Sequence, residues 1–187
     1  MKKTDTKISF SFTVENLEKA ESIIARYPEG RHKSALLPLL DLAQRQNDGW
    51  VTHEMIEYIS NMLNVPFIKA MEVASFYTMI NLAPVGKFHI QVCGTTPCFL
   101  RGAEDIMRIC KEKLNIEENE TTEDGLFSLK EVECLGACVN APMVQINDDY
   151  YEDLTKEIMS DIIDKLQSGQ KVDIGSQIGR VGSKARD

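Results

Sequence analysis

The chain has 187 residues, of which 43% are hydrophobic and 27% charged, and its formal net charge is −8. Such a composition is ordinary for one large globular domain or two small ones. An acidic chain without a basic stripe is poorly suited to nucleic acid or to an anionic membrane surface. No window approaches the roughly 18 apolar residues that a membrane-spanning helix needs. We therefore expect no nucleic-acid partner, no direct membrane insertion, and partners that are other proteins.

The first 12 residues include basic side chains, but no apolar run follows them. They match neither a secretory signal nor an Arg-rich transit peptide, so we predict a cytoplasmic protein. Because thiols stay reduced in that compartment, its five cysteines are better suited to metal binding or catalysis than to structural disulfides.

Residues 1–83 are predicted to form a helical N-terminal domain. Apolar residues recur there at helical spacing in four segments, separated by short connections. Thr13, Ser34 and Thr52 are suitable N-caps for the first three helices. The predicted helices cover residues 13–27, 34–44, 52–63 and 67–77. His32 and His53 show no paired metal-ligand spacing, so we expect no chemistry in this domain.

Alternation of apolar and polar residues replaces the helical period after Pro84. One predicted strand, with Phe88 and Val92 on one face, leads directly into Cys93, and a second leads into Cys134. Further strands are expected at residues 143–146 and 150–151, and helices at 100–114 and 155–169. The order predicts an α/β domain over residues 84–170 and an α+β fold class for the whole chain. Residues 171–187 are expected to form a flexible tail.

Four of the cysteines lie in two close pairs, in loops that follow predicted strands. The pairs are Cys93-Gly-Thr-Thr-Pro-Cys98 and Cys134-Leu-Gly-Ala-Cys138. Four thiolates so arranged can form two disulfides, hold a zinc ion or ligate an iron–sulfur cluster. The fifth, Cys110, falls in the buried stripe of the predicted helix 100–114, where a small core residue is expected.

The composition of the two loops favours a cluster. Gly94 and Gly136 let backbone N–H groups approach sulfur, and a [2Fe–2S] centre needs such donors because its negative charge grows on reduction. Zinc would tolerate these spacings. Neither pair has the C-x-x-C spacing of a dithiol redox enzyme, and His89 is predicted to face away from the apolar side of its strand. Zinc, disulfides and a catalytic thiol remain open on the residues alone.

Several blocks of the sequence belong together. They are Tyr27–Arg31, Ser34–Gln44, Gly49–Trp50, Val73–Met79, Pro84–Gly86, Ile90–Cys98, Gly125–Phe127 and Glu131–Met143. In these blocks the chain resembles the 24 kDa iron–sulfur subunits of bacterial NADH:quinone oxidoreductase (respiratory complex I). The resemblance covers most of the chain, and the two cysteine-bearing blocks are its most specific part.

The resemblance implies a thioredoxin-like α/β domain carrying one [2Fe–2S] cluster, with Cys93, Cys98, Cys134 and Cys138 as ligands and no catalytic residue. It implies electron exchange with FMN in a partner subunit that binds NADH and FMN, within the electron-transport assembly of the respiratory chain. Other peripheral-arm subunits are further expected partners, on the cytoplasmic face of the inner membrane. The oxidoreductase and translocase activity then belongs to the complex, as NADH dehydrogenase activity.

Two alternatives remain. Similar domains serve as diaphorase-type [2Fe–2S] subunits of NAD-linked hydrogenases or formate dehydrogenases. A zinc-stapled interaction module with no redox role is the alternative from a different class, and its support is the set of four cysteines.

Overall fold

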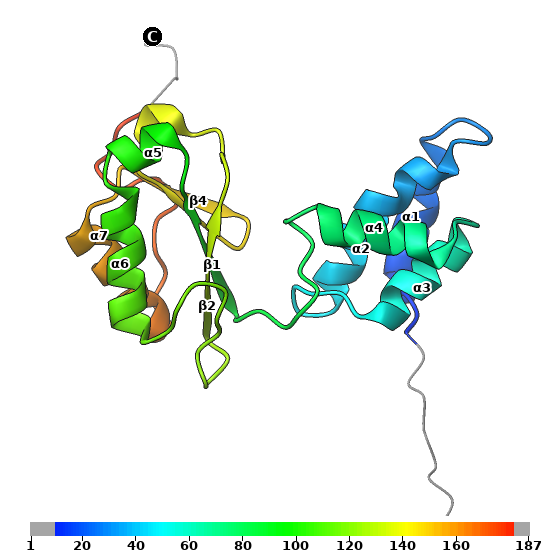
Figure 1. Ribbon diagram of the computed structural model, residues 1–187, viewed down its shortest axis with the longest axis horizontal. Helices are drawn as coiled ribbons and strands as arrows, with labels where there is room; N and C mark the ends of the chain where they lie inside the picture. The colour runs from blue at the N-terminus through cyan, green and yellow to red at the C-terminus, as the bar shows by residue number, and fades with distance from the viewer. Residues whose placement is uncertain (1–9, 182–187) are drawn as a thin grey trace, which may run out of the picture. The chain divides into compact units, whose positions relative to one another are not determined.

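The computed structural model describes residues 10–181, and the chain divides into two compact units between Pro84 and Val85. We call residues 10–84 the helical unit and residues 85–181 the sheet unit (Figure 1). The sequence places the boundary one residue earlier, after residue 83. Among the described residues, no helix is long and apolar enough to cross a membrane.

The helical unit contains four α-helices and one short 3-10 helix. They are α1 (Val14–Ala25), η1 (His32–Ala35), α2 (Leu36–Gln46), α3 (His53–Met62) and α4 (Phe67–Phe76). Thr13 and Thr52 are N-caps as predicted, because their hydroxyls accept hydrogen bonds from the backbone N–H groups of Asn16 and Met55, each at 3.2 Å. The prediction for Ser34 is wrong, since it lies inside η1 and Ala35 precedes α2 without a side-chain cap.

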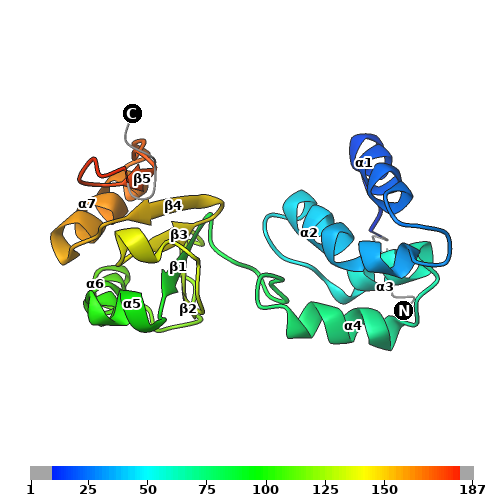
Figure 2. The ribbon, with the colours of Figure 1, turned by 90° about the horizontal axis from the view of Figure 1, so that it is seen from above.

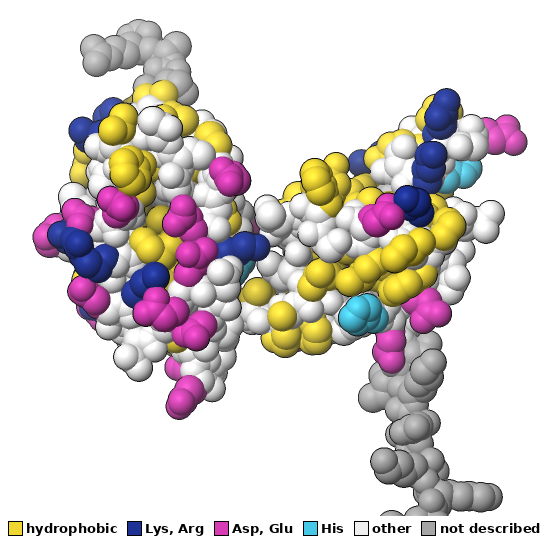
Figure 3. All heavy atoms as spheres, viewed as in Figure 1, with side chains coloured by type: hydrophobic (Ala, Val, Ile, Leu, Met, Phe, Trp, Pro, Cys, Tyr) yellow, Lys and Arg dark blue, Asp and Glu magenta, His cyan; other side chains and the backbone are white. Residues whose placement is uncertain are grey.

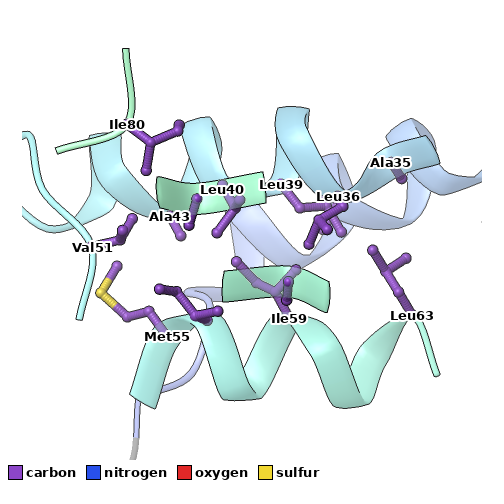
Figure 4. Packing of buried hydrophobic residues seen from close by; sticks show 14 of the residues in the cluster. Ala35, Leu36, Leu39, Leu40, Ala43, Val51, Met55, Ile59, Leu63 and Ile80 are labelled. Carbon is purple, nitrogen blue, oxygen red and sulfur yellow. The ribbon is translucent and has the colours of Figure 1, made fainter. Parts of the chain in front are cut away.

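One continuous core holds the helical unit together. Leu39 and Leu40 of α2 point toward Met55 and Ile59 of α3 (Figure 4), and all four side chains are at most 1% exposed. Burying aliphatic side chains of this size contributes roughly 1.5–3 kcal/mol each. The apolar periodicity of the sequence therefore identifies the core of this unit.

A band of exposed apolar side chains lies over α4 in the helical unit (Figure 3). This helix is apolar on nearly every face, so only part of its surface can be buried in the core. Large hydrophobic residues of α4 and of the segment after it that remain exposed are Phe67, Ile68, Phe76, Tyr77, Met79 and Leu82.

The sheet unit is built on a mixed five-stranded sheet with the order β2-β1-β3-β4-β5. Central strand β1 (Phe88–Cys93) pairs in parallel with β2 (Phe127–Val132) and antiparallel with β3 (Val144–Ile146). Strand β4 (Asp149–Glu152) returns antiparallel to β3 through a turn in which Asn147 has a positive φ of 55°. The α+β class predicted from the sequence is confirmed.

Two long helices, α6 (Ala103–Leu114) and α7 (Lys156–Gln167), lie side by side over one face of this sheet (Figures 1 and 2). Ile90 and Val92 of β1 pack with Ile106 of α6 and Met159 of α7 in the core beneath them. Cys110 is fully buried in the same core, as the sequence predicts.

The first helix after the cysteine-bearing strand is broken, which differs from the single helix predicted over residues 100–114. A short helix α5 (Thr96–Leu100) precedes α6, and between them Gly102 adopts a φ of +98° that favours glycine. Leu100 is consequently 75% exposed and lies outside the buried stripe to which it was assigned.

The segment after residue 170, for which the sequence predicts a flexible tail, contacts the sheet in its described part. Strand β5 (Gly175–Ser176) pairs in parallel with β4 at the edge of the sheet (Figure 2). Arg180, further along, forms an ion pair with Asp153. Residues 182–187 lie outside the described residues.

Candidate metal centre

The two cysteine pairs lie at one end of the central strands of the sheet unit. Cys93 is the last residue of β1, and Cys98 lies in α5 immediately after it. Cys134 follows β2, and Cys138 begins the short 3-10 helix η2 (Cys138–Asn140). Because β1 and β2 run parallel, their carboxyl ends lie at the same end of the sheet, and both cysteine loops therefore start there.

The pairs differ in exposure. Cys93 and Cys98 are 2% and 1% exposed, whereas Cys134 and Cys138 are solvent-exposed. The site therefore has one pair anchored in the interior and one pair at the surface.

The sulfur atoms of each pair interact with one another. Burial raises the pKa of the Cys98 thiol to about 12, with further contributions from the hydrogen bond and charge of Cys93. Loss of water around its sulfur raises the pKa of Cys138, and the charge and hydrogen bond of Cys134 add to that rise. In each pair, the charge of one sulfur therefore disfavours ionisation of the other.

The two pairs also lie close to one another. The charge of Cys138 contributes to the raised pKa of Cys98, and the charge of Cys93 contributes to that of Cys138. Within residues 10–181, no three His, Cys, Asp or Glu side chains converge as the ligands of a metal ion would. The donors that the structure brings together are thus two neighbouring sulfur pairs, and each pair could hold one iron of a two-iron cluster.

Backbone N–H groups are directed at the sulfurs of the interior pair. Burial alone would raise the pKa of Cys93, but hydrogen bonds from the Thr95 hydroxyl and from the backbone of Leu135 and Thr95 outweigh it and leave the pKa below its ordinary value. The distance between the Thr95 hydroxyl and the Cys93 sulfur is 3.4 Å. The backbone of Met143 donates to Cys98. These donors favour negatively charged sulfur, as a cluster requires.

The donors come partly from residues that the sequence did not single out. We expected Gly94 and Gly136 to open the backbone to sulfur, whereas the N–H groups that reach it belong to Thr95, Leu135 and Met143. Gly136 still matters, because its φ of +81° is a conformation that other residues rarely adopt. It turns the loop directly after Leu135.

A small apolar cluster surrounds the interior pair. Ala103, Ala141 and Met143 are buried against Cys93 and Cys98, with Leu135 and Tyr150 partly buried at its edge. The Tyr150 hydroxyl donates to the backbone oxygen of Leu135 at 2.8 Å, so β4 also holds the second cysteine loop. A low-dielectric surrounding of this kind controls solvent access to a metal site.

The remaining candidate residues lie away from the sulfurs. Cys110 is buried under α6 and α7, where burial raises the pKa of its thiol to about 12. The His89 imidazole is half-buried on the other face of the sheet, with its Nδ1 2.7 Å from the Ser128 hydroxyl. Cys110 and His89 cannot form a reactive thiol–imidazole pair with each other, because they lie on opposite faces of the sheet.

The fold and the site define a class of thioredoxin-like iron–sulfur proteins. The family model described as thioredoxin-like [2Fe–2S] ferredoxin matches residues 20–167, so the chain belongs to that family. Membership implies one [2Fe–2S] cluster, and the sulfur pairs with their N–H donors fit that group.

Comparison with curated proteins gives the branch of the family. The E subunit of the NADH-quinone oxidoreductase of Rickettsia bellii is 65% identical over 165 residues, which cover 88% of this chain and 99% of the relative. The protein of the same name from Rickettsia conorii is 64% identical with the same coverage. The resemblance seen in the sequence blocks is thereby confirmed.

Solved structures support the fold. A chain of an NAD⁺-reducing [NiFe]-hydrogenase in the air-oxidised state aligns with a TM-score of 0.61 and 20% sequence identity, over 72% of this chain and 23% of the hydrogenase chain. At this identity the likeness shows the fold alone. The present chain spans less than a quarter of the hydrogenase chain that it matches.

Proposed function

We propose that this chain is an electron-transfer subunit of an NADH-quinone oxidoreductase and that its one [2Fe–2S] cluster exchanges electrons with FMN in a partner subunit. The observation that carries this proposal is the 65% identity to a subunit of that enzyme over 99% of the relative's length. The diaphorase alternative is weaker, because the hydrogenase likeness has 20% identity and extends to the fold alone.

The ligands in this proposal are Cys93, Cys98, Cys134 and Cys138. Their support is the meeting of two sulfur pairs at one edge of the sheet, with Cys110 left in a separate core. A [2Fe–2S] cluster supplies one-electron redox chemistry that the polypeptide lacks. No side chain of this site is proposed to transfer a proton or to attack a substrate.

The surrounding residues would tune that chemistry. The N–H groups of Thr95, Leu135 and Met143 would stabilise the additional negative charge of the reduced state. The buried pair would keep one side of the site dry, while exposed Cys134 and Cys138 would present the other side to a redox partner. The expected partners are the subunit that binds FMN and NADH and other peripheral-arm subunits, on the cytoplasmic face of the inner membrane.

Cluster content after cysteine substitution tests the proposal. We expect the purified wild-type chain to contain about two irons and two acid-labile sulfides and to give an EPR signal after anaerobic reduction. Cys134→Ser should weaken or lose the cluster. Cys110→Ser is the matched control, a buried cysteine in the same unit, and should retain it.

Two results would contradict the proposal. A colourless wild-type protein that carries zinc and no iron would support the zinc-stapled interaction module instead. Equal loss of iron in both variants would show that the ligand assignment is wrong.

A further inference from the structure

The backbone of the second cysteine loop is held in place directly after Cys138. The carbonyl oxygen of Asn140 accepts a hydrogen bond from the backbone N–H of Asp153 at 2.8 Å, and that of Pro142 accepts one from Leu154 at 3.0 Å. Both donors follow β4, so this half of the loop is fixed to the sheet.

Two arginines complete the set of donors. The carbonyl oxygen of Val139 accepts from Arg180 Nη2 at 2.5 Å. The carbonyl oxygen of Ala141 accepts a longer hydrogen bond from Arg101 Nε, at 3.4 Å. All four carbonyl groups that follow Cys138 therefore have a donor, and Arg180 supplies the one for the residue adjacent to Cys138.

Arg180 is oriented by a buried carboxylate. Asp153 is 8% exposed, and its two oxygens accept hydrogen bonds from Nη2 and Nε of Arg180. The Ser176 hydroxyl donates to the same carboxylate at 2.7 Å. An arginine held through two nitrogens by a nearly buried carboxylate loses little further freedom when it makes another hydrogen bond.

The segment that carries Arg180 is itself fixed to the sheet. Strand β5 pairs with β4, and the backbone N–H of Gln177 donates to the carbonyl of Glu152 at 3.1 Å. The backbone N–H of Arg180 donates to the Ser176 hydroxyl at 3.0 Å. The guanidinium therefore bridges the β4–β5 edge of the sheet and the cysteine loop.

We propose that Arg180 is a positioning residue for the cluster, which holds Cys138 in place through the Val139 carbonyl and is itself oriented by Asp153. This inference rests on the ligand assignment proposed above. Val139 is exposed, and among residues 10–181 Arg180 is the donor to its carbonyl. Without the guanidinium, only water would hydrogen-bond to this carbonyl, and the backbone next to Cys138 would lose its link to the sheet. Groups that orient metal ligands typically affect metal affinity by 10–100-fold when they are removed.

The test uses the full cluster-loaded chain and the rate at which a chelator removes its iron. Arg180→Gln should lose the visible absorbance of the cluster on the order of tenfold faster than wild type, with a broadened EPR signal in the reduced protein. Arg180→Lys keeps the charge near Asp153, but one ammonium group replaces the fork of donors, so an intermediate rate is expected. This milder variant serves if Arg180→Gln does not fold.

Arg108→Gln is the matched control, because Arg108 also pairs with an aspartate, Asp105, but on the exposed surface of α6. It should release iron at the wild-type rate. Rates of Arg180→Gln and Arg180→Lys equal to those of wild type and Arg108→Gln would overturn the inference. So would an acceleration that merely follows a lowered unfolding midpoint of the sheet unit, measured by circular dichroism, with an unchanged EPR line shape.

The wild-type protein separates this inference from the proposed function. A wild-type chain without iron and sulfide overturns the proposed function and this inference with it. A wild-type chain with a normal cluster, combined with unaffected Arg180 variants, overturns only the role of Arg180.

Discussion

The helical unit and the sheet unit differ in how their hydrophobic cores are arranged. The helical unit has one continuous core, in which buried aliphatic side chains of α2 and α3 face each other. The sheet unit has a main core between the sheet and its helices and a separate small cluster around Cys93 and Cys98. The unit that contains the four paired cysteines is thus the one whose core is divided, and its cysteine loops are held by backbone hydrogen bonds as well as by apolar packing.

The surfaces of the two units differ as well. Apolar side chains form a band over α4 of the helical unit, whereas acidic and basic side chains cover much of the face that the sheet unit shows in Figure 3. A large exposed apolar patch is typical of a protein–protein contact. The apolar band therefore fits a subunit that works within an assembly.

The largest predicted effect tests whether the two cores are independent. Leu39 is fully buried in the core of the helical unit. Leu39→Ala should lower the free energy of unfolding of that unit by about 2–5 kcal/mol, through lost apolar transfer and the remaining cavity. The visible and EPR spectra of the loaded cluster should not change. Denaturation followed by helical circular dichroism, with the cluster absorbance recorded in parallel, measures both.

Ile68→Ala is the control for this substitution, because Ile68 is 61% exposed on α4. It should change the free energy of unfolding by less than about 0.5 kcal/mol. A Leu39→Ala protein that loses its cluster together with its helices would show that the two units form one cooperative structure.

Local patterns explain how much could be predicted from the sequence. The four helices of the helical unit and the buried position of Cys110 follow from apolar periodicity, because the core selects one face of each helix. The N-caps at Thr13 and Thr52 were likewise recognisable, since a threonine before an apolar period satisfies free N–H groups. The cysteine pairs can be read directly from the sequence, and the strands that precede them follow from the alternation of apolar and polar residues.

Features that depend on distant residues could not be predicted. The apolar spacing of the sequence runs without interruption from Leu100 to Leu114, so the pattern did not reveal the break between α5 and α6 at Gly102. The position of residues 175–180 against the sheet depends on pairing with β4 and on the ion pair between Arg180 and Asp153. Their composition is that of a polar tail. The N–H donors to sulfur belong to backbone groups, which nearly every residue carries, so side-chain identity did not reveal them.

A smaller effect concerns the polar face of the sheet. Burial, together with the charge of Lys130, lowers the pKa of His89 from 6.5 to about 4. Between these values the unfolded chain binds a proton that the folded chain does not, so stability is complete above pH 6.5 and falls as the pH falls toward 4. One pKa unit corresponds to about 1.4 kcal/mol, so the loss is at most on the order of 3 kcal/mol.

The variant His89→Asn measures that contribution, because its amide can retain a hydrogen bond with the Ser128 hydroxyl. The free energy of unfolding of each protein is measured by urea denaturation at several pH values. Between pH 6.5 and pH 4, the wild-type value should fall by more than the value of the variant. Carboxylates titrate in both proteins and cancel in this difference. A difference that stays constant with pH would contradict a neutral buried imidazole.

The smallest predicted effect concerns the two helices that cover the sheet. Lys113 of α6 donates to Ser160 at 2.7 Å and to Asp164 at 2.5 Å, both on α7, and its side chain is 22% exposed. Lys113→Met should lower the free energy of unfolding of the sheet unit by about 0.5–1 kcal/mol, since a partly buried pair between helices is screened less than an exposed one.

Lys165→Met provides the comparison, because Lys165 pairs with Asp161 within α7 and is 42% exposed. A pair at this spacing contributes only about 0.3–0.5 kcal/mol. Urea denaturation of both variants at low and high salt separates the two cases. If Lys113→Met lowers the free energy of unfolding by no more than Lys165→Met does, the packing of α6 on α7 depends on apolar contacts alone. In that respect the sheet unit would resemble the helical unit, whose helices pack through a continuous apolar core.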